Sequence, residues 1–417
     1  MSRPAVLADF CDLVSQHVDP TTLDTQCLYL GMEHLAPGRM RPIAFGCAGD
    51  VQSHKFSFRK GDVLYGKLRP YLDKAVMVSS DGVCTTELLV FRPKPSVDPR
   101  YLACLVHAPD FVEHAMSGVT GAQHPRTSWS HVSQFPVPGL DEQEQRSIAD
   151  LLWRVHDLMI ACQSSEQTAQ ALKRTAMREL FMRGLRGEPQ QETRIGLVPE
   201  SWKIVPLESL GKIGNGSTPK RSVPAYWNGG TYPWLTSAKV YDREIEAADQ
   251  FVTDTALDEC HLPRVKPDAV LMAITGQGKT LGHCAVLKIE ATISQHVAYL
   301  QTDTEKAEPS FIRGYLESQY EYLRQVAAGG GSTKGALTCA FLKSLPVPLP
   351  SKDEQREVAA ILDTLDRRID LHRKKRSVLE ELFKSLLHKL ITGEISVSDL
   401  DLSVLLSAST QREEIAA

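Results

Sequence analysis

Gly278-Lys279-Thr280 ends like a phosphate-binding loop, the one stretch of this chain that suggests nucleotide chemistry. That motif needs a further Gly five residues before Gly278, and position 273 is Ala. The residues that follow, LGHCAVL, predict a strand, whereas phosphate binding requires a helix N-terminus. The sequence therefore predicts no nucleotide hydrolysis.

Two further motifs resemble parts of a methyltransferase, and both are broken. Residues 98–101 read DPRY, with Arg where the amino-methyltransferase tetrapeptide has its second Pro, and residues 45–49 (FGCAG) lack the central Gly of the methyl-donor loop. The 13 histidines leave a Ser/His/Asp triad open, but no G-x-S-x-G nucleophile turn occurs. We expect His296 to make polar contacts rather than ligate a metal, and we expect the chain not to be an enzyme, with no catalytic, cofactor-binding or metal-binding residue.

Several loops instead combine Gly with Arg, Lys, Gln and Thr, the side chains that hydrogen-bond base edges and phosphates. Examples are YGKLRPYLDK (65–74) and TGQGKT (275–280). The alternative is that these are ordinary solvated loop charges, and we expect Trp227 and Trp234 to lie in a domain core. The candidate DNA-binding residues are Lys67, Arg69 and Arg126 in the first half and Thr218, Lys220, Lys239, Gln277, Lys279 and Lys334 in the second.

The chain contains an internal repeat. Residues 135–149 (FPVPGLDEQEQRSIA) match residues 345–359 (LPVPLPSKDEQREVA) at an offset of 210. Residues 176–188 match 382–394 at an offset of 206, and both segments end in Gly-Glu. A repeat this long is not a solenoid period, so it indicates two copies of a domain followed by a helix.

Each copy predicts a helix of about 40 residues, roughly 60 Å long. N-caps with an acid three residues later start the helices, Asp141 with Glu144 and Ser351 with Glu354. We expect Gln145, Arg146, Gln355 and Arg356 to cap, pair or dock rather than touch bases. Apolar residues then recur in heptads, which favours a coiled coil between the two helices over packing of each helix on its own domain. In the first helix one heptad position is held by Ile148, Val155, Cys162 and Ala169, and the position that faces with it by Leu151, Leu158 and Leu172. In the second helix the corresponding positions are held by Val358, Leu365, Leu379 and Leu386, and by Ile361 and Leu382.

The segments that precede these helices read alike in both halves. Apolar runs predict strands at 62–68, 75–78 and 86–91, and again at 269–274, 283–289 and 296–301. One amphipathic helix is expected in each half, at 101–116 and at 311–327, and each is followed by a Gly-containing loop. We therefore expect two heads of related fold whose surfaces differ.

With these repeats, and with GSTPK…YWNGG…PWLT (216–236), the chain resembles the specificity subunits of type I restriction-modification enzymes along its whole length. The first half has no equivalent of the last stretch. The resemblance implies an α+β protein in which two β-rich target recognition domains are joined by two long helices, which pair as an antiparallel coiled coil with pseudo-two-fold symmetry. The implied domains are recognition domain 1 (1–140), helical spacer 1 (141–188), recognition domain 2 (189–350), helical spacer 2 (351–395) and an acidic flexible tail (396–417).

The resemblance also implies partners. Such subunits bind a bipartite site on double-stranded DNA and dock two modification (methyltransferase) subunits and the restriction subunits. S-adenosylmethionine, ATP and Mg²⁺ belong to those partners, so no cofactor is expected in this chain. The alternatives are an assembly scaffold that binds no DNA and a methyltransferase in its own right.

Net charge, cysteine spacing and hydropathy bear on DNA affinity, metal or disulfide content, and location in the cell. The net charge of −4 comes mostly from the tail, and both heads are near neutral. We therefore expect weak DNA binding by the isolated chain, since non-specific binders carry excess Lys and Arg. The nine scattered cysteines include no C-x-x-C, which argues against a zinc site or a disulfide framework. No apolar run predicts a signal peptide or a membrane span, so a cytoplasmic location without membrane partners is expected.

Overall fold

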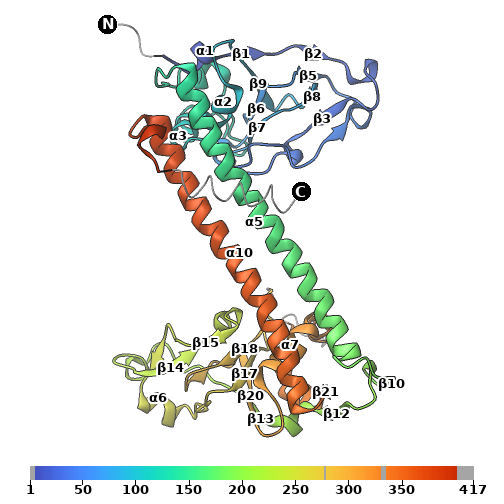
Figure 1. Ribbon diagram of the computed structural model, residues 1–417. Helices are drawn as coiled ribbons and strands as arrows, with labels where there is room; N and C mark the ends of the chain where they lie inside the picture. The colour runs from blue at the N-terminus through green and yellow to red at the C-terminus, as the bar shows by residue number, and fades with distance from the viewer. Residues whose placement is uncertain (1–4, 277–278, 330–334, 402–417) are drawn as a thin grey trace. The chain divides into compact units, whose positions relative to one another are not determined.

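The computed structural model describes residues 5–276, 279–329 and 335–401. The chain forms two compact units, residues 1–164 with 373–417, and residues 165–372. Two long helices contribute to both units: α5 (Glu142–Arg183) and α10 (Lys352–Thr392), drawn in green and orange-red in Figure 1.

The first unit is built on two sheets. An antiparallel sheet has the order β1-β9-β6-β7, and a second sheet has the order β2-β5-β8-β3-β4 with β3 and β8 parallel. The strands are β1 (Cys11–Val14), β2 (His17–Val18), β3 (Leu28–Leu30), β4 (Gly46–Cys47), β5 (Lys55–Phe58), β6 (Val63–Gly66), β7 (Ala75–Met77), β8 (Gly82–Cys84) and β9 (Leu88–Pro93).

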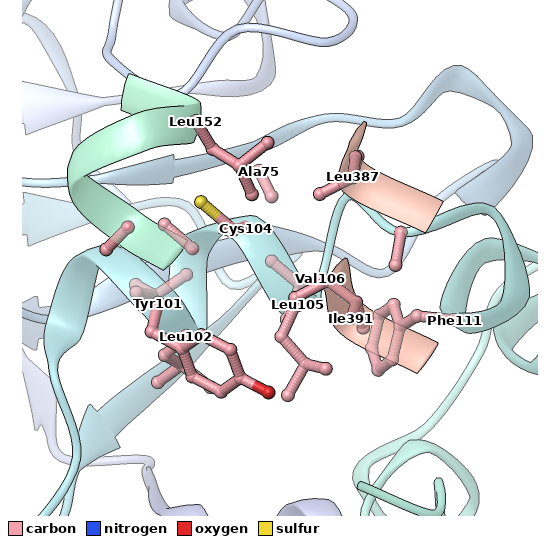
Figure 2. Packing of buried hydrophobic residues seen from close by; sticks show 14 of the residues in the cluster. Ala75, Tyr101, Leu102, Cys104, Leu105, Val106, Phe111, Leu152, Leu387 and Ile391 are labelled. Atoms are coloured by element: carbon pink, nitrogen blue, oxygen red, sulfur yellow. The ribbon is translucent and has the colours of Figure 1, made fainter. Parts of the chain in front are cut away.

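Helices cover the first of these sheets. They are α1 (Leu7–Phe10), α2 (Pro99–Leu105), α3 (Pro109–Ser117) and α4 (Trp129–Val132). Five consecutive residues of α2 are buried because this helix lies inside a core shared with the start of α5 and the end of α10. Figure 2 shows Tyr101 and Leu105 of α2 in this core with Leu152 of α5 and Ile391 of α10.

The second unit has a five-stranded sheet, β13-β20-β17-β18-β15, and a three-stranded sheet, β16-β14-β19. Two short pairs, β10-β11 and β12-β21, complete it. The strands are β10 (Gln190–Thr193), β11 (Gly196–Pro199), β12 (Lys203–Pro206), β13 (Gly211–Asn215), β14 (Tyr232–Leu235), β15 (Glu244–Ile245), β16 (Phe251–Val252), β17 (Ala269–Ala273), β18 (Cys284–Leu287), β19 (Thr292–Ile293), β20 (Val297–Thr302) and β21 (Pro346–Leu349). The helices are α6 (Asp254–Glu259), α7 (Pro309–Ser318), α8 (Tyr320–Gly329) and α9 (Cys339–Ser344).

The two heads share a topology. The order β1-β9-β6-β7 recurs as β13-β20-β17-β18, and the parallel pair β3-β8 recurs as β14-β19. In each head two helices follow the sheet (α2 and α3, α7 and α8), and a short helix precedes the long one (α4, α9). The predicted relation between the two halves is confirmed at the level of the fold.

The long helices pair antiparallel. In the first unit the end of α10 packs against the start of α5 through Phe383, Leu387 and Leu152. In the second unit the start of α10 packs against the end of α5 through Leu362 and Phe181. The α+β class and the antiparallel helix pair are thus confirmed.

One half of the predicted helix seam is wrong. Val358 and Leu386 are buried as expected, but Ile361 and Leu382 are 39% and 37% exposed. The buried partner positions lie four residues after each heptad residue rather than three, as at Leu362. On α5 Leu172 is likewise exposed, and Lys173 is buried in its place.

Each predicted head helix is in fact two helices. The expected helix 101–116 is interrupted between α2 and α3, where Pro109 is the first residue of α3. Proline has no N–H and its ring clashes with the preceding turn, so the helix restarts there. The expected helix 311–327 is likewise split, between Ser318 and Tyr320. The described helices include none long and apolar enough to cross a membrane.

Candidate nucleic-acid interface

Three loops meet at one end of the sheet in the first head: residues 67–74 after β6, residues 85–87 before β9, and residues 118–128 before α4. Backbone hydrogen bonds join them. The Arg69 N–H donates to the Pro125 carbonyl at 2.7 Å, and the Thr127 N–H donates to the Lys67 carbonyl at 3.0 Å. The Lys67 N–H donates to the Glu87 carbonyl at 3.1 Å. We call this set of loops the first loop surface.

The first loop surface brings the three predicted residues of this head together. Lys67 and Arg69 are half-buried, and Leu68 between them forms a bridge with Arg126. The Arg126 guanidinium binds the Glu87 carboxylate through two hydrogen bonds, Nε to Oε2 at 3.0 Å and Nη2 to Oε1 at 3.3 Å. A planar bidentate pair fixes the direction of an Arg side chain.

Residues behind the loop hold it in place. The buried His107 contacts the Asp73 carboxylate through Nδ1 at 2.6 Å and the Ala75 carbonyl through Nε2 at 3.0 Å. Burial alone would lower the pKa of His107, but the Asp73 carboxylate and the backbone carbonyls outweigh burial and raise it. A protonated His107 satisfies both acceptors at once and anchors the end of the loop to the core.

The second head repeats this arrangement. Residues 274–276 and 279–283 between β17 and β18, the turn before β20 (294–296) and residues 335–338 before α9 come together. The Leu337 N–H donates to the Ile274 carbonyl at 2.8 Å, and Thr275 forms a bridge with Ala336. The Ile274 N–H donates to the His296 carbonyl at 3.0 Å, as Lys67 does to Glu87. These loops form the second loop surface.

Polar side chains are linked across the second loop surface. Thr275 Oγ1 contacts His296 Nδ1 at 2.5 Å, and Gln295 Nε2 lies 3.2 Å from His296 Nε2. Thr218 donates its hydroxyl hydrogen to the Gln295 side-chain oxygen. With Gln295 donating, Nδ1 carries the imidazole hydrogen and donates to Thr275. Gln295 and His296 are exposed, and Gln295 keeps one N–H and one oxygen lone pair for further hydrogen bonds.

Aromatic side chains support residues 279 and 280 of the second loop surface. Tyr320 donates its hydroxyl hydrogen to the Lys279 carbonyl at 2.7 Å, and the Tyr241 hydroxyl lies 3.0 Å from Thr280 Oγ1. The His283 ring lies between these two tyrosines, with centroids 4.7 and 4.8 Å apart. Burial lowers the pKa of His283, so the ring is neutral at neutral pH. Lys279 is exposed, and the hydrogen bond from Tyr320 holds its backbone in place.

Other predicted residues lie elsewhere or are already paired. The Lys239 ammonium lies 3.2 Å from Asp249 and 3.4 Å from Asp242, and these hydrogen bonds and charges raise its pKa. Lys220 is exposed, and its carbonyl accepts from Trp227 Nε1 at 3.2 Å. Gln277 and Lys334 lie outside the described residues.

Next to Lys220, Arg221 was not predicted. Its guanidinium stacks 3.7 Å from the Trp227 ring and 5.0 Å from the Trp234 ring. Trp234 is buried in a hydrophobic cluster, as expected, and Trp227 packs partly buried against that cluster. Stacking holds the Arg221 plane and leaves its charge near an exposed loop.

Glu87, Gln295 and the Tyr241–His283–Tyr320 cluster were also missed, whereas His296 makes polar contacts as expected. The repeat contained a usable signal, because TTE (85–87) and SQH (294–296) each precede a strand at equivalent places. Among the described residues no group of three or more His, Cys, Asp or Glu side chains could hold a metal ion.

The repeated Glu-Gln pair joins each head to its long helix. Gln145 Oε1 accepts from the Asp98 N–H at 3.2 Å, and Gln355 Oε1 accepts from the Glu308 N–H at 2.8 Å. Both glutamines donate to the carbonyl five residues earlier. Asp98 and Glu308 are the N-caps of α2 and α7. These buried glutamines thus make the same contact twice, away from the loop surfaces.

The neighbouring acids differ between the copies. Asp141 and Glu144 form the predicted reciprocal cap, with backbone N–H to carboxylate distances of 3.0 and 2.8 Å. The side chain of Glu354 instead accepts from the Leu185 N–H at 3.0 Å and Trp202 Nε1 at 3.2 Å. The predicted hydrogen bond from the Ser351 N–H to the Glu354 carboxylate is therefore absent, because this carboxylate binds the residues that follow α5 instead.

Comparison with known proteins fits this architecture. Residues 199–381 match the family described as type I restriction modification DNA specificity domain. The MjaIX specificity subunit of Methanocaldococcus jannaschii is 31% identical over 215 residues, which cover 49% of this chain and 48% of that protein. The alignment thus spans about half the length of that relative. The putative MjaX specificity subunit of the same organism is 27% identical over 74% of this chain and 71% of its own length.

Solved structures show the same fold. The type I restriction-modification S subunit from M. genitalium aligns with a TM-score of 0.60 at 14% identity, covering 93% of this chain and 96% of its own. A chain from a structural study of complex assembly and conformational transition in a type I R-M system aligns with a TM-score of 0.57 at 21% identity, covering 94% and 98%. With its repeated heads and antiparallel helices, this chain is similar to the specificity subunits of type I restriction-modification enzymes, in sequence over the matched stretches and in fold over most of its length.

Proposed function

We propose that this chain recognises a bipartite site on double-stranded DNA, one half through each loop surface. One observation carries the proposal: two heads of the same topology present equivalent loops with different polar side chains. The first surface carries Lys67, Arg69 and Arg126, and the second carries Lys279, Gln295 and His296. Loops that are held by equivalent backbone contacts but carry different side chains suit the recognition of two different DNA sequences.

We propose further that methyltransferase and restriction subunits dock on the helices. In both units α10 exposes large apolar side chains. Val378 is 63% exposed and Leu382 37% in the first unit, and Leu371 is 50% exposed in the second. Val378 and Leu382 are four residues apart and share a face of the helix. Exposed apolar residues on a polar helix favour a protein partner.

In this proposal the chain itself does no chemistry. Methylation of adenine with S-adenosylmethionine and cleavage with ATP and Mg²⁺ belong to the partner subunits. Two methyltransferase subunits would fit the two-fold repeat of the helices. The assembly would act on DNA in the cytoplasm.

DNA selection tests the proposal. The chain assembled with its cognate methyltransferase subunits is mixed with a random duplex library, and bound duplexes are sequenced. The expected result is one motif made of two defined segments separated by a spacer of fixed length. Recovery of no motif would favour the alternative, a scaffold whose helices assemble partners without DNA binding.

A further inference from the structure

The seam between α5 and α10 contains a buried lysine in the second unit. Lys173 is only 6% exposed, and its ammonium lies 2.5 Å from Glu317 Oε1 of α7 and 2.6 Å from Asp366 Oδ1 of α10. Arg313 of α7 closes the ring, with guanidinium nitrogens 3.2 Å from Glu317 Oε2 and 2.9 Å from Asp366 Oδ2. We call Lys173, Arg313, Glu317 and Asp366 the junction network. It joins three helices.

The junction network is electrically balanced and adjoins a close helix contact. Two cations face two anions, and Asp366 also lies 3.9 Å from Arg243, which itself pairs with Asp363 at 3.0 Å. Next to Arg313, a Cβ at Gly314 would lie 2.7 Å from Leu362 Cδ1 of α10. A side chain at this position would press on the end of the Leu362 side chain, so glycine lets α7 and α10 pack closely without displacing it. The network and the glycine therefore fix the same pair of helices at one level.

The internal repeat shows that this fold does not require the charges. At the offset of 210 residues, Arg313, Glu317 and Asp366 correspond to Ala103, His107 and His156. These three are buried in the first unit, where the junction is formed mainly by apolar contacts. A buried ion pair adds little stability over apolar residues of similar size, because desolvation offsets attraction.

Such a network is sensitive to register. A slip of α5 by one turn would place Ala169 or Met177 where Lys173 lies. Glu317 and Asp366 would then share a buried site with Arg313 as their only common cation in the network. Breaking a buried ion pair is strongly unfavourable, even where forming it adds little. One polar side chain in a helix seam specifies register in this way.

We infer that the junction network is a set of positioning residues that holds α7, and with it the second head, at one level on the helix pair, so that only one spacer length is accepted. This inference rests on the proposed function. It assigns a role in spacer selection to residues that touch no DNA.

The test uses the full chain assembled with its methyltransferase subunits. The double variant K173M/E317Q removes one cation and one anion and keeps the Arg313–Asp366 pair. We expect an unfolding temperature close to that of the natural chain. We expect methylation of sites whose spacer is one base pair longer or shorter to rise at least about tenfold, a change equivalent to 1.4 kcal/mol.

The control is E179Q/R183Q, which removes an exposed ion pair of 3.1 Å from the same helix and should leave the spacer unchanged. K173R retains the charge and should also keep a single spacer. The inference is overturned if K173M/E317Q methylates only the original spacer, or if it unfolds, because the network would then serve stability alone. If the natural chain directs methylation to no bipartite site, the proposed function fails instead.

Discussion

Arg69 illustrates how single residues shape the first loop surface. Its φ of +53° is unusual for a residue with a side chain, and it directly precedes Pro70, which normally favours extended backbone. Asp73, at the other end of the short 3₁₀ turn Pro70–Leu72, has a φ of +48°. The Asp73–His107 contact and the Arg69–Pro125 hydrogen bond hold this conformation. Strained backbone that the surroundings stabilise is typical of binding loops.

Lys279 is the residue on the second loop surface with the clearest expected effect. In the assembly with methyltransferase subunits, Lys279→Glu should weaken DNA binding for all sequences and lower the slope of log affinity against log salt by about one, as loss of a phosphate contact does. Lys306→Glu is the matched control. The Lys306 side chain is 58% exposed and lies before the start of α7, whereas Lys279 contacts Tyr320, which follows the end of α7. Fluorescence anisotropy at several salt concentrations measures both. Equal slopes for the two variants would contradict a DNA contact at Lys279.

His156 predicts an acid-sensitive first unit. Burial lowers its pKa to about 4, and its Nε2 accepts from the Met40 N–H at 3.3 Å. An unfolded His titrates near 6.5, so the unfolded state binds the proton first as the pH falls. The free energy of unfolding should therefore drop by up to about 1.4 kcal/mol per pH unit between roughly pH 6.5 and 4. His107, whose pKa is raised, acts in the opposite sense, and its contribution is lost as the pH rises through its folded pKa.

Urea unfolding at several pH values tests this. His156→Gln keeps an acceptor and should flatten the acid limb of the stability profile, whereas His54→Gln at an exposed position should not. An unchanged acid limb in His156→Gln would show that other groups cause the loss.

At the scale of elements, α10 exposes Val378 and Leu382 on one face. The double variant V378D/L382D should reduce affinity for the methyltransferase subunit at least about tenfold, because two charges would enter an apolar contact. The fold should persist, since both side chains are exposed. Ser377→Asp, at an exposed position about 100° around the same helix from Val378, is the control. Isothermal titration calorimetry measures the binding, and undiminished affinity of the double variant would place the docking surface elsewhere.

The sequence predicts the elements better than their contacts. Continuous apolar runs identified β6, β17 and β20 within two residues at each end, because strands buried on both faces need such runs. The seam was harder to predict because Ile361 and Leu362 are both apolar, and only the partner helix decides which one is buried. Lys173 could not be predicted in the seam at all, since its burial depends on acids of two other helices.

The same limit applies to the candidate interface. Lys67, Arg69 and Arg126 were predicted from residue type, and the structure brings them together. Glu87 was missed because its pairing with Arg126 spans 39 residues. Lys239 was chosen for its charge, which the structure places beside Asp242 and Asp249.

At the scale of the whole molecule, near-neutral heads predict weak DNA binding by the chain alone. Few phosphate contacts release few counterions, so little non-specific affinity is expected. Adding the methyltransferase subunits should raise affinity at physiological salt by about a hundredfold or more, because linked contacts act together. Filter binding with and without those subunits measures this. Tight specific binding by the isolated chain would contradict the prediction.

The central claim is that each head reads one half of a bipartite site. Sequencing methylated adenines in cells that carry this chain with its methyltransferase tests it most directly, with the natural chain compared with K67A/R69A. The account predicts one bipartite motif for the natural chain and a motif relaxed in one half alone for the variant. Methylation without a bipartite motif, or relaxation of both halves together, would contradict it.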